Sequence, residues 1–125
     1  MTQRTKGQVE AEISHTLVKF ELEYMGRGPS DVRTHLLRDM VVVRLKGILT
    51  PAERQLVKAE GVELIKQVRA KLLETGQSVL KQSLEELTGL SIVSMHSDLS
   101  TTTGERVILF VMSGNVEEKF GGLIR

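Results

Sequence analysis

Two arginines are the first side chains of this sequence whose type and spacing could support chemistry. Arg33 and Arg44 lie in neighbouring strand-like segments, and a two-residue turn at 38–39 pairs them directly across those strands. Like charges in such positions repel each other, and a planar anion or a carboxylate between the two guanidinium groups would remove the repulsion. The alternative, which needs no ligand, is that both side chains extend into water.

A second candidate is the pair His96 and Asp98, which lie two residues apart in a strand-like segment and therefore point to the same side. A histidine oriented by a carboxylate is the beginning of a general base or of a metal site. The chain has three histidines and no cysteine, and no His-Glu pair has the helical spacing of a zinc site. We therefore expect no metal, no cofactor and no catalytic residue, with an enzyme that uses His96 and Asp98 as the alternative.

A third candidate is Arg27 in the loop Gly26-Arg27-Gly28-Pro29, whose backbone N–H groups could meet an anion. The loop follows a helix C-terminus, where the helix dipole repels anions, so a plain connection is the alternative. His35 joins the set because it shares the strand face of Arg33 and Arg44. The predicted ligand-binding residues are Arg27, Arg33, His35, Arg44, His96 and Asp98.

The elements that must position these residues follow from periodicity and capping signals. Residues 6–25 and 51–88 show helical spacing of apolar residues, each after a Thr-x-x-Glu/Gln capping box, and residues 32–47 and 92–112 have the pattern of two hairpins. We expect an α+β domain of α-ββ-α-ββ order, in which an antiparallel four-stranded sheet packs on two helices. The inward residues of the first hairpin are Val32, Thr34, Leu36, Val41, Val43 and Leu45. Those of the second hairpin are Val93, Met95, Leu99, Ile108, Phe110 and Met112.

The second helix is too long for a compact domain. An unbroken helix over 51–88 would extend ~57 Å at ~1.5 Å per residue, whereas a domain of this size has a radius of gyration of ~14 Å. The helix therefore breaks near Gly61 or Thr75-Gly76, or it projects and packs on a second copy. The stripe that contains Ile65, Leu72 and Leu80 passes Gly76 without changing phase, which favours the unbroken helix.

Length and composition limit the function classes. The 125 residues fit one domain, with a core over about 6–112 and a loose tail at 113–125. A net charge of +1 and few aromatic residues argue against nucleic-acid binding. The longest apolar run, residues 107–112, has the length of a strand, so we expect no insertion into a membrane. The start of the chain has no apolar stretch, from which we expect a cytoplasmic protein.

Three segments resemble a known family: 24–29 (YMGRGP), 39–53 (DMVVVRLKGILTPAE) and 96–107 (HSDLSTTTGERV). They are similar to the MpsC-like family, whose members are often labelled as subunits of a Na-translocating decarboxylase, and the resemblance covers residues 7–112. It implies a link to membrane-potential generation and inorganic-carbon handling, and hence a membrane-protein partner. The chain carries no biotin-carrier or decarboxylase motif, so the implied role is that of a soluble accessory or regulatory domain.

Together these observations predict a binding or regulatory domain that forms a homodimer through its long helix, its second sheet face, or both. The expected ligand is a small anion, and bicarbonate is compatible with the arginines and with the resemblance. The alternative is a purely structural homodimeric interaction module.

Overall fold

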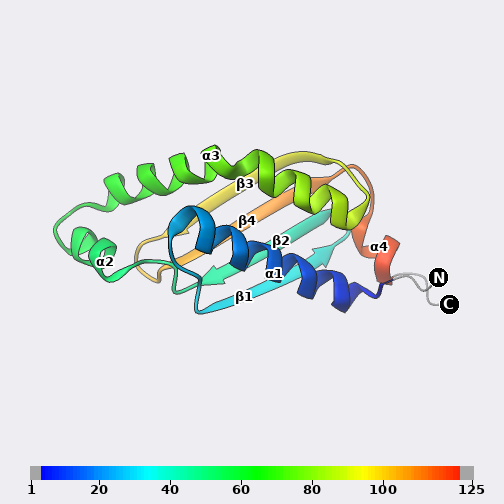
Figure 1. Cartoon of the computed structure of the whole chain (residues 1–125), viewed down its shortest axis with the longest axis horizontal. Helices are drawn as coiled ribbons and strands as arrows, with labels where there is room; N and C mark the ends of the chain where they lie inside the picture. Colours follow the sequence, from blue (N-terminus) through cyan, green and yellow to red (C-terminus); the bar gives the residue numbers. More distant parts are fainter. Residues whose placement is uncertain (1–3, 122–125) are drawn as a thin grey trace.

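The computed structural model describes residues 4–121, in which helices cover one face of a four-stranded antiparallel sheet (Figure 1). The α+β class and the order of helices and hairpins are those predicted from the sequence. The elements are α1 (Lys6–Met25), β1 (Asp31–Leu37), β2 (Met40–Lys46), α2 (Pro51–Lys58), α3 (Val62–Thr88), β3 (Ile92–Ser100), β4 (Glu105–Met112) and α4 (Val116–Gly121).

The helix ends follow their capping signals. The side chain of Thr5 accepts a hydrogen bond from the backbone of Gln8 and the Gln8 side chain accepts one from the backbone of Thr5, so the predicted capping box is present. Thr50 and Glu53 form the same arrangement at the start of α2. Helix α1 ends at Gly26, whose φ of 78° is a left-handed conformation that glycine adopts without strain.

The long helical segment is broken, and the favoured expectation of one unbroken helix is wrong. Helix α2 ends at Lys58, and Glu60 then adopts a left-handed φ of 66° before α3 begins. The backbone N–H of Gly61 donates a hydrogen bond to the carbonyl of Leu56 at 2.6 Å, which closes this turn. Excess helix length therefore gives no support to a dimer.

Helix α3 runs through Gly76 without interruption, and its buried stripe agrees with the predicted one at Ile65, Leu80 and Leu84 but not at Val68, Leu72 and Leu87. Leu73 is buried where the prediction has Leu72, which is only partly buried, and Val68 is 43% exposed. The remaining buried positions were missed because three of them are the polar residues Arg69 and Thr88 and the glycine Gly76. The buried residues of α3 are Ile65, Arg69, Leu73, Gly76, Leu80, Leu84 and Thr88.

The sheet has the strand order β1-β2-β4-β3. In the first hairpin the predicted register is confirmed, including the pairing of Arg33 with Arg44. In the second hairpin Ser100 pairs with Glu105, so the loop has four residues instead of two, which leaves the faces unchanged. Val93 is the exception: a bulge between Ile92 and Ser94 turns it outward, and it is 67% exposed instead of inward.

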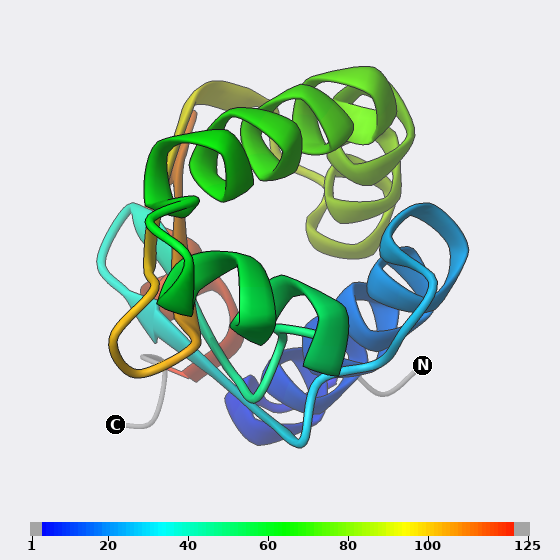
Figure 2. The ribbon, with the colours of Figure 1, turned by 90° about the vertical axis from the view of Figure 1, so that its left-hand side faces the viewer.

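Helices α1 and α3 bury the inner face of the sheet, and within residues 4–121 no element covers the opposite face (Figure 2). Figure 1 shows α1 over β1 and β2, with α3 along β3 and β4. The core is formed largely by Val9, Ile13, Leu17, Leu36, Val41, Val43, Leu45, Leu80, Leu84, Ile108 and Phe110.

Part of the segment after β4 is helical and packs on the domain, which corrects the prediction of a loose tail for these residues. Residues 116–121 form α4, in which Val116 is buried and Phe120 is 9% exposed. The backbone N–H of Glu117 donates to the carbonyl of Arg38, which holds α4 against the first hairpin. The rest of the predicted tail, residues 122–125, lies outside the described residues. Among the helices of residues 4–121, none has the length and apolar character needed to cross a membrane.

Candidate functional site

The uncovered side of the sheet, which we call the outer sheet face, carries five of the six predicted ligand-binding residues. Strand pairing arranges most of it in three rows across the four strands, and the pairs Asp31–Lys46 and Ser100–Glu105 continue the face beyond the first row. The first row is Arg33, Arg44, Val107 and Asp98; the second is His35, Val42, Leu109 and His96; the third is Leu37, Met40, Val111 and Ser94. The middle of the face is therefore apolar, and charged or histidine side chains stand at its margins.

The arginine pair lies side by side on this face, but each guanidinium group has a carboxylate of its own. Arg33 Nε lies 3.4 Å from Asp31 Oδ2, and Arg44 forms an ion pair with Glu105. Both arginine side chains are more than half exposed. These neighbours already relieve part of the repulsion that an anion was expected to relieve.

His96 and Asp98 share the face as predicted, but they contact different groups. The Nε2 atom of His96 lies 3.2 Å from the hydroxyl of Ser94. Asp98 accepts a hydrogen bond from the backbone N–H of Leu99 at 2.8 Å and lies 3.5 Å from Lys66 Nζ. The backbone hydrogen bond from Leu99, helped by Lys66, holds the pKa of Asp98 below its usual value. The arrangement does not aim the carboxylate at the imidazole as a general base would require.

Arg27 lies apart from the outer sheet face. Its Nη1 atom donates a hydrogen bond to the carbonyl of Leu49 at 3.1 Å, so this side chain ties the loop after α1 to the segment before α2. Within residues 4–121 no group of three or more histidine, aspartate or glutamate side chains could hold a metal ion.

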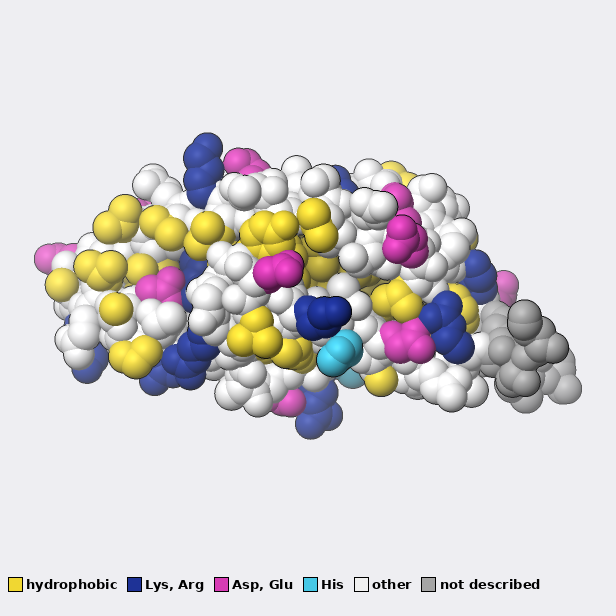
Figure 3. Space-filling view, in the orientation of Figure 1, with side chains coloured by type: hydrophobic (Ala, Val, Ile, Leu, Met, Phe, Trp, Pro, Cys, Tyr) yellow, Lys and Arg dark blue, Asp and Glu magenta, His cyan; other side chains and the backbone are white. Residues whose placement is uncertain are grey.

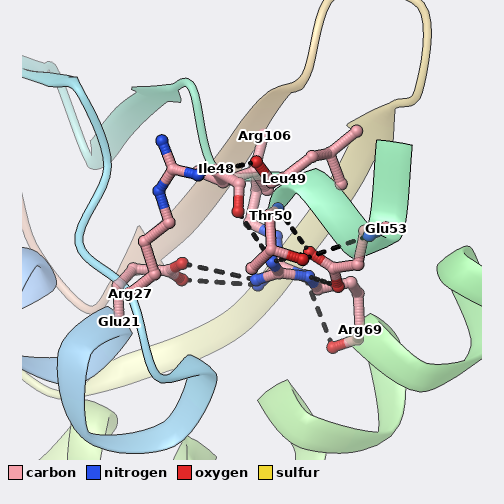
Figure 4. Close-up of polar contacts among 8 residues, drawn as sticks. All are labelled: Glu21, Arg27, Ile48, Leu49, Thr50, Glu53, Arg69 and Arg106. Carbon is pink, nitrogen blue, oxygen red and sulfur yellow. Dashed lines mark hydrogen bonds and ion pairs between the residues drawn. The ribbon is translucent and has the colours of Figure 1, made fainter. Parts of the chain in front are cut away.

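Four charged residues that the sequence analysis did not select form a cluster in the interior (Figure 4). This buried charge cluster consists of Glu21 from α1, Glu53 from α2, Arg69 from α3 and Arg106 from β4. Glu21 is fully buried, and Arg69 and Arg106 are each 2% exposed. Buried ions persist only when they are paired, so each member depends on the others.

Arg69 is the best-paired member of the cluster. Its Nε and Nη2 atoms donate to the two carboxylate oxygens of Glu53 at 2.9 Å and 2.6 Å, a bidentate pair, and Nη2 also donates to the carbonyl of Ile48 at 2.7 Å. These bonds fasten α2 and the preceding turn to α3. The remaining atom, Nη1, faces Glu21 at 3.6 Å.

Glu21 and Arg106 are less well satisfied. Glu21 lies between the two guanidinium groups, with Oε2 3.8 Å from Arg106 Nη1, and Arg106 Nη2 donates to the carbonyl of Arg69 at 3.3 Å. Among the described residues, both Glu21 oxygens, Arg69 Nη1 and the Nε and Nη1 atoms of Arg106 form no hydrogen bond. Such buried polar groups are rare in folded proteins and require an explanation.

Burial shifts the pKa values of the carboxylates and of Arg106 in this cluster in opposite directions. Burial raises the pKa of Glu21 above its usual value although Arg106 and Arg69 favour its charged form, and burial lowers the pKa of Arg106 although Glu21 opposes the change. For Glu53 burial acts in the same sense as for Glu21, but the hydrogen bonds from Arg69 and Thr50 outweigh it, and the pKa is lowered. Glu21 is thus the member of the cluster that takes up a proton most easily.

A partly enclosed cavity of about 230 Å³, the α3–β3 cavity, adjoins this cluster. Arg69 and Arg106 form part of its wall, Leu73 and Leu99 contribute apolar surface, and Lys66 is one of the charged groups along it. The other lining residues are Ala70, Glu74, Gln77, Met95, Ser97 and Asp98.

The sequence does contain a signal for the cluster. Arg69 falls on the buried stripe between Ile65 and Leu73, and Arg106 alternates with the inward Ile108 and Phe110. A charged residue at a position that the periodicity assigns to the core marks a buried ion pair or a site.

A second apolar surface lies on the helical side of the molecule. Leu56 of α2 and Leu64 and Val68 of α3 are each 42–51% exposed, and we call them the apolar end. Figure 3 shows hydrophobic side chains gathered at this end, to the left, over α2 and the first turns of α3.

Comparison with known proteins places the chain among relatives of similar length. A family model described as "Na+-translocating membrane potential-generating system (MpsC)" matches residues 5–114. The uncharacterized protein YbcI of Bacillus subtilis (strain 168) is 45% identical over 116 residues, which cover 92% of this chain and 94% of YbcI. The uncharacterized protein YrhF of the same organism is 27% identical over 110 residues, 86% of this chain and 90% of YrhF. No solved structure matches the chain at a significant level.

Proposed function

The chain belongs to the MpsC family, and we propose that it is a cytoplasmic accessory or regulatory binding domain of a membrane-potential-generating or inorganic-carbon system. The observation that carries the proposal is the outer sheet face, which no described element covers and whose centre is apolar. An uncovered apolar sheet face is typical of a surface that another molecule covers. A membrane-protein partner is part of this proposal.

The first occupant that we propose for the outer sheet face is a second copy of the chain. If one copy is rotated by 180° about an axis parallel to the strands, β1 of one subunit faces β3 of the other, and each row faces the same row. Arg33 then faces Asp98 of the partner subunit, and Val42 faces Leu109 of the partner subunit. These two contacts are complementary, as a twofold interface requires, whereas the same rotation places Arg44 opposite Val107 and Leu37 opposite Ser94.

The edges of the sheet support pairing through the face rather than through a strand edge. Glu10 accepts a hydrogen bond from the backbone N–H of Leu36 on β1 at 2.9 Å. On β3, Glu85 accepts from Ile92 at 2.9 Å and Asp98 accepts from Leu99 at 2.8 Å. Because these carboxylates already accept hydrogen bonds from the outward N–H groups, a strand from another chain would have to displace them to pair with the edge.

The size of the face predicts a weak dimer. Four strands ~4.8 Å apart and seven residues ~3.4 Å apart give a footprint of roughly 19 Å by 24 Å. That footprint is about half of the ~800 Å² that each partner contributes to a standard interface. We expect dissociation at roughly tens to hundreds of micromolar, in the range of small interfaces.

Light scattering and sedimentation over this concentration range test the dimer. Val42→Lys places a charge at the apolar centre of the outer sheet face and should yield a monomer, whereas Val79→Lys on the exposed side of α3 is the matched control and should dimerise normally. Arg33→Asp should weaken the dimer, and Asp98→Arg in the same chain should restore it. A wild type that remains monomeric at the highest concentration, or a Val79→Lys effect equal to that of Val42→Lys, contradicts the proposal.

A second candidate function is the sensing of a small anion such as bicarbonate by Arg33 and Arg44, which the confirmed register places side by side. Two guanidinium groups suit a planar anion, although Asp31 and Glu105 compete for them. Thermal unfolding of the wild type, Arg33→Gln and Arg44→Gln with and without bicarbonate tests it. A stabilisation by millimolar bicarbonate that both variants lose supports this function, and an equal response of all three proteins contradicts it.

A further inference from the structure

Two histidines stand in the same row of the outer sheet face, at opposite edges of the sheet. His35 lies on β1 and His96 on β3, and Val42 and Leu109 lie between them in the row. Both histidines are exposed, on the side of the sheet that no described element covers (Figure 2). The third histidine of the chain, His15, is on α1, on the other side of the sheet.

Within one chain these two imidazoles do not meet. Three strand spacings of ~4.8 Å separate β1 from β3, so the backbones at the two positions are ~14 Å apart. Two nitrogens bound to one Zn²⁺, each at ~2.0–2.1 Å, are at most ~4.2 Å from each other. The side chains of Val42 and Leu109 occupy the space between the histidines. Each chain alone therefore offers two separate imidazoles.

The dimer proposed above brings them together, because its rotation exchanges the two edges of the sheet. In the second row, His35 faces His96 of the partner subunit, and the symmetry repeats this pair at the other edge. Packed sheets lie ~10 Å apart, so facing side chains meet between them. Aligned sheets cross at ~30°, which displaces edge positions by roughly 4 Å, about half the spacing between rows, and leaves the two imidazoles neighbours.

The surroundings of the pair suit a metal ion. Neutral imidazole is a preferred ligand of Zn²⁺, Ni²⁺ and Cu²⁺. The hydroxyl of Ser94 lies 3.2 Å from His96 Nε2, and a hydrogen bond to one ring nitrogen orients the ring and leaves the other nitrogen for a metal. The nearest cation along β1 is Arg33, which is paired with Asp31 at 3.4 Å and also faces Asp98 of the partner subunit in the dimer. These carboxylates offset its repulsion of a metal ion.

We propose that two outer sheet faces together form two equivalent sites for a divalent transition-metal ion of the zinc or nickel class, each made by His35 of one chain and His96 of the partner subunit. Water completes the coordination, because two side chains fill only half of a tetrahedral shell. The inference rests on the dimer proposed above and adds a ligand that tightens it. The metal then controls how much of the domain is dimeric.

The size of the effect follows from linkage. Since each site needs both chains, the metal strengthens the dimer by the same factor by which the dimer strengthens metal binding. At a free Zn²⁺ concentration ten times the Kd of a site, one site tightens the dimer about tenfold and two sites about a hundredfold.

The experiment is sedimentation equilibrium of the full chain without an affinity tag, in EDTA, in ZnCl₂ and in MgCl₂. Zn²⁺ should lower the dissociation constant of the wild-type dimer, and Mg²⁺, which prefers oxygen ligands, should not. Equilibrium dialysis should find one bound Zn²⁺ for each chain.

Three histidine variants locate the site. His35→Ala and His96→Ala each remove one ligand from both sites, so Zn²⁺ should leave their dissociation constants as they are in EDTA. His15→Ala is the matched control and should respond as the wild type does. An equal mixture of His35→Ala and His96→Ala forms mixed dimers that keep one complete site, so the mixture should regain about tenfold of tightening and one Zn²⁺ for each mixed dimer.

The possible failures separate this inference from the proposed function. If the wild type dimerises in EDTA and Zn²⁺ does not tighten the dimer, the metal site is rejected and the dimer stands. If His35→Ala or His96→Ala still responds, or His15→Ala does not, the ion binds elsewhere and the site is rejected. A mixture that gains nothing rejects the pairing across the twofold axis. A wild type that is monomeric in EDTA but dimerises in Zn²⁺ with these variant effects retains the metal site and rejects the metal-free dimer, and a monomer under both conditions rejects both.

Discussion

Gly76 of helix α3 packs directly against Phe20 and Tyr24 of α1, and its replacement by alanine tests the packing of the two helices. A Cβ atom at this position would lie 2.6 Å from Phe20 Cε1, 2.9 Å from Phe20 Cζ and 3.1 Å from Tyr24 Cδ1. Carbon atoms in contact are normally ~3.5–4.0 Å apart, so the Phe20 ring would have to move by about 1 Å. Phe20 is 4% exposed and stacks on Tyr24 with ring centroids 4.8 Å apart, which leaves it little room.

Two opposing effects decide whether Gly76→Ala raises or lowers the free energy of unfolding. Alanine stabilises a helix interior by ~1 kcal/mol relative to glycine, whereas overpacking of a core costs ~1–3 kcal/mol. We expect the overpacking to prevail and the free energy of unfolding to fall by about 1 kcal/mol. Gly7→Ala in α1 is the matched control: a Cβ there meets nothing within 4 Å, so this variant should gain a few tenths to ~1 kcal/mol.

Urea unfolding followed by circular dichroism measures both glycine variants, and the shift of the midpoint at constant slope gives the change in stability. Phe20→Leu should reduce the penalty of Gly76→Ala, because the smaller side chain leaves space for the added methyl group. If Gly76→Ala stabilises the protein as much as Gly7→Ala does, then α1 and α3 do not approach each other as described and the reasoning is refuted.

Two other predictions concern the core and the buried charge cluster. Leu73→Ala should cost ~2–5 kcal/mol and Leu72→Ala less than half as much, because Leu73 is 6% exposed and Leu72 is only partly buried; equal losses in urea unfolding would mean that the phase of α3 is wrong. Because the pKa of Glu21 is raised in the folded state, the folded chain binds this proton more tightly, and stability falls as the pH rises from the usual carboxyl range through the raised pKa. Glu21→Gln should remove that fall from a curve of unfolding free energy against pH, and an unchanged curve would contradict the assignment. The lowered pKa of Glu53 affects stability in the opposite direction. The stability that Glu53 contributes is fully present above the usual carboxyl pKa, and it is lost as the pH falls through the lowered pKa of Glu53 in the folded state.

Local signals in the sequence were sufficient for much of the fold. Each capping box fixes a helix start through atoms three residues apart, and the two-residue turn fixes the register that brings Arg33 beside Arg44. The two predictions of local structure that were wrong, the unbroken helix and the inward Val93, also have local causes. The break between α2 and α3 depends on a left-handed Glu60, a conformation unusual for a residue with a side chain, and the bulge reverses the direction of Val93.

The buried charge cluster could not be predicted with the same means. Its members come from positions 21, 53, 69 and 106, and only the complete packing of α1, α2, α3 and β4 brings them together. A sequence pattern shows that a charged residue occupies a core position, but the identity of its partner is a property of tertiary structure. The shared face of Arg33, His35 and Arg44 was predictable, because strand geometry alone determines which residues of a hairpin point to the same side.

The most direct test of the central claim, that the domain binds through its outer sheet face, is a concentration series of amide NMR spectra of the wild-type chain. The account predicts that the amide signals of Val42, Leu109 and Val111 and of their neighbours in the three rows shift with concentration and approach a limit, while those of the apolar end at Leu56 and Leu64 stay in place. Shifts confined to the apolar end, or an absence of shifts at millimolar concentration, would contradict it.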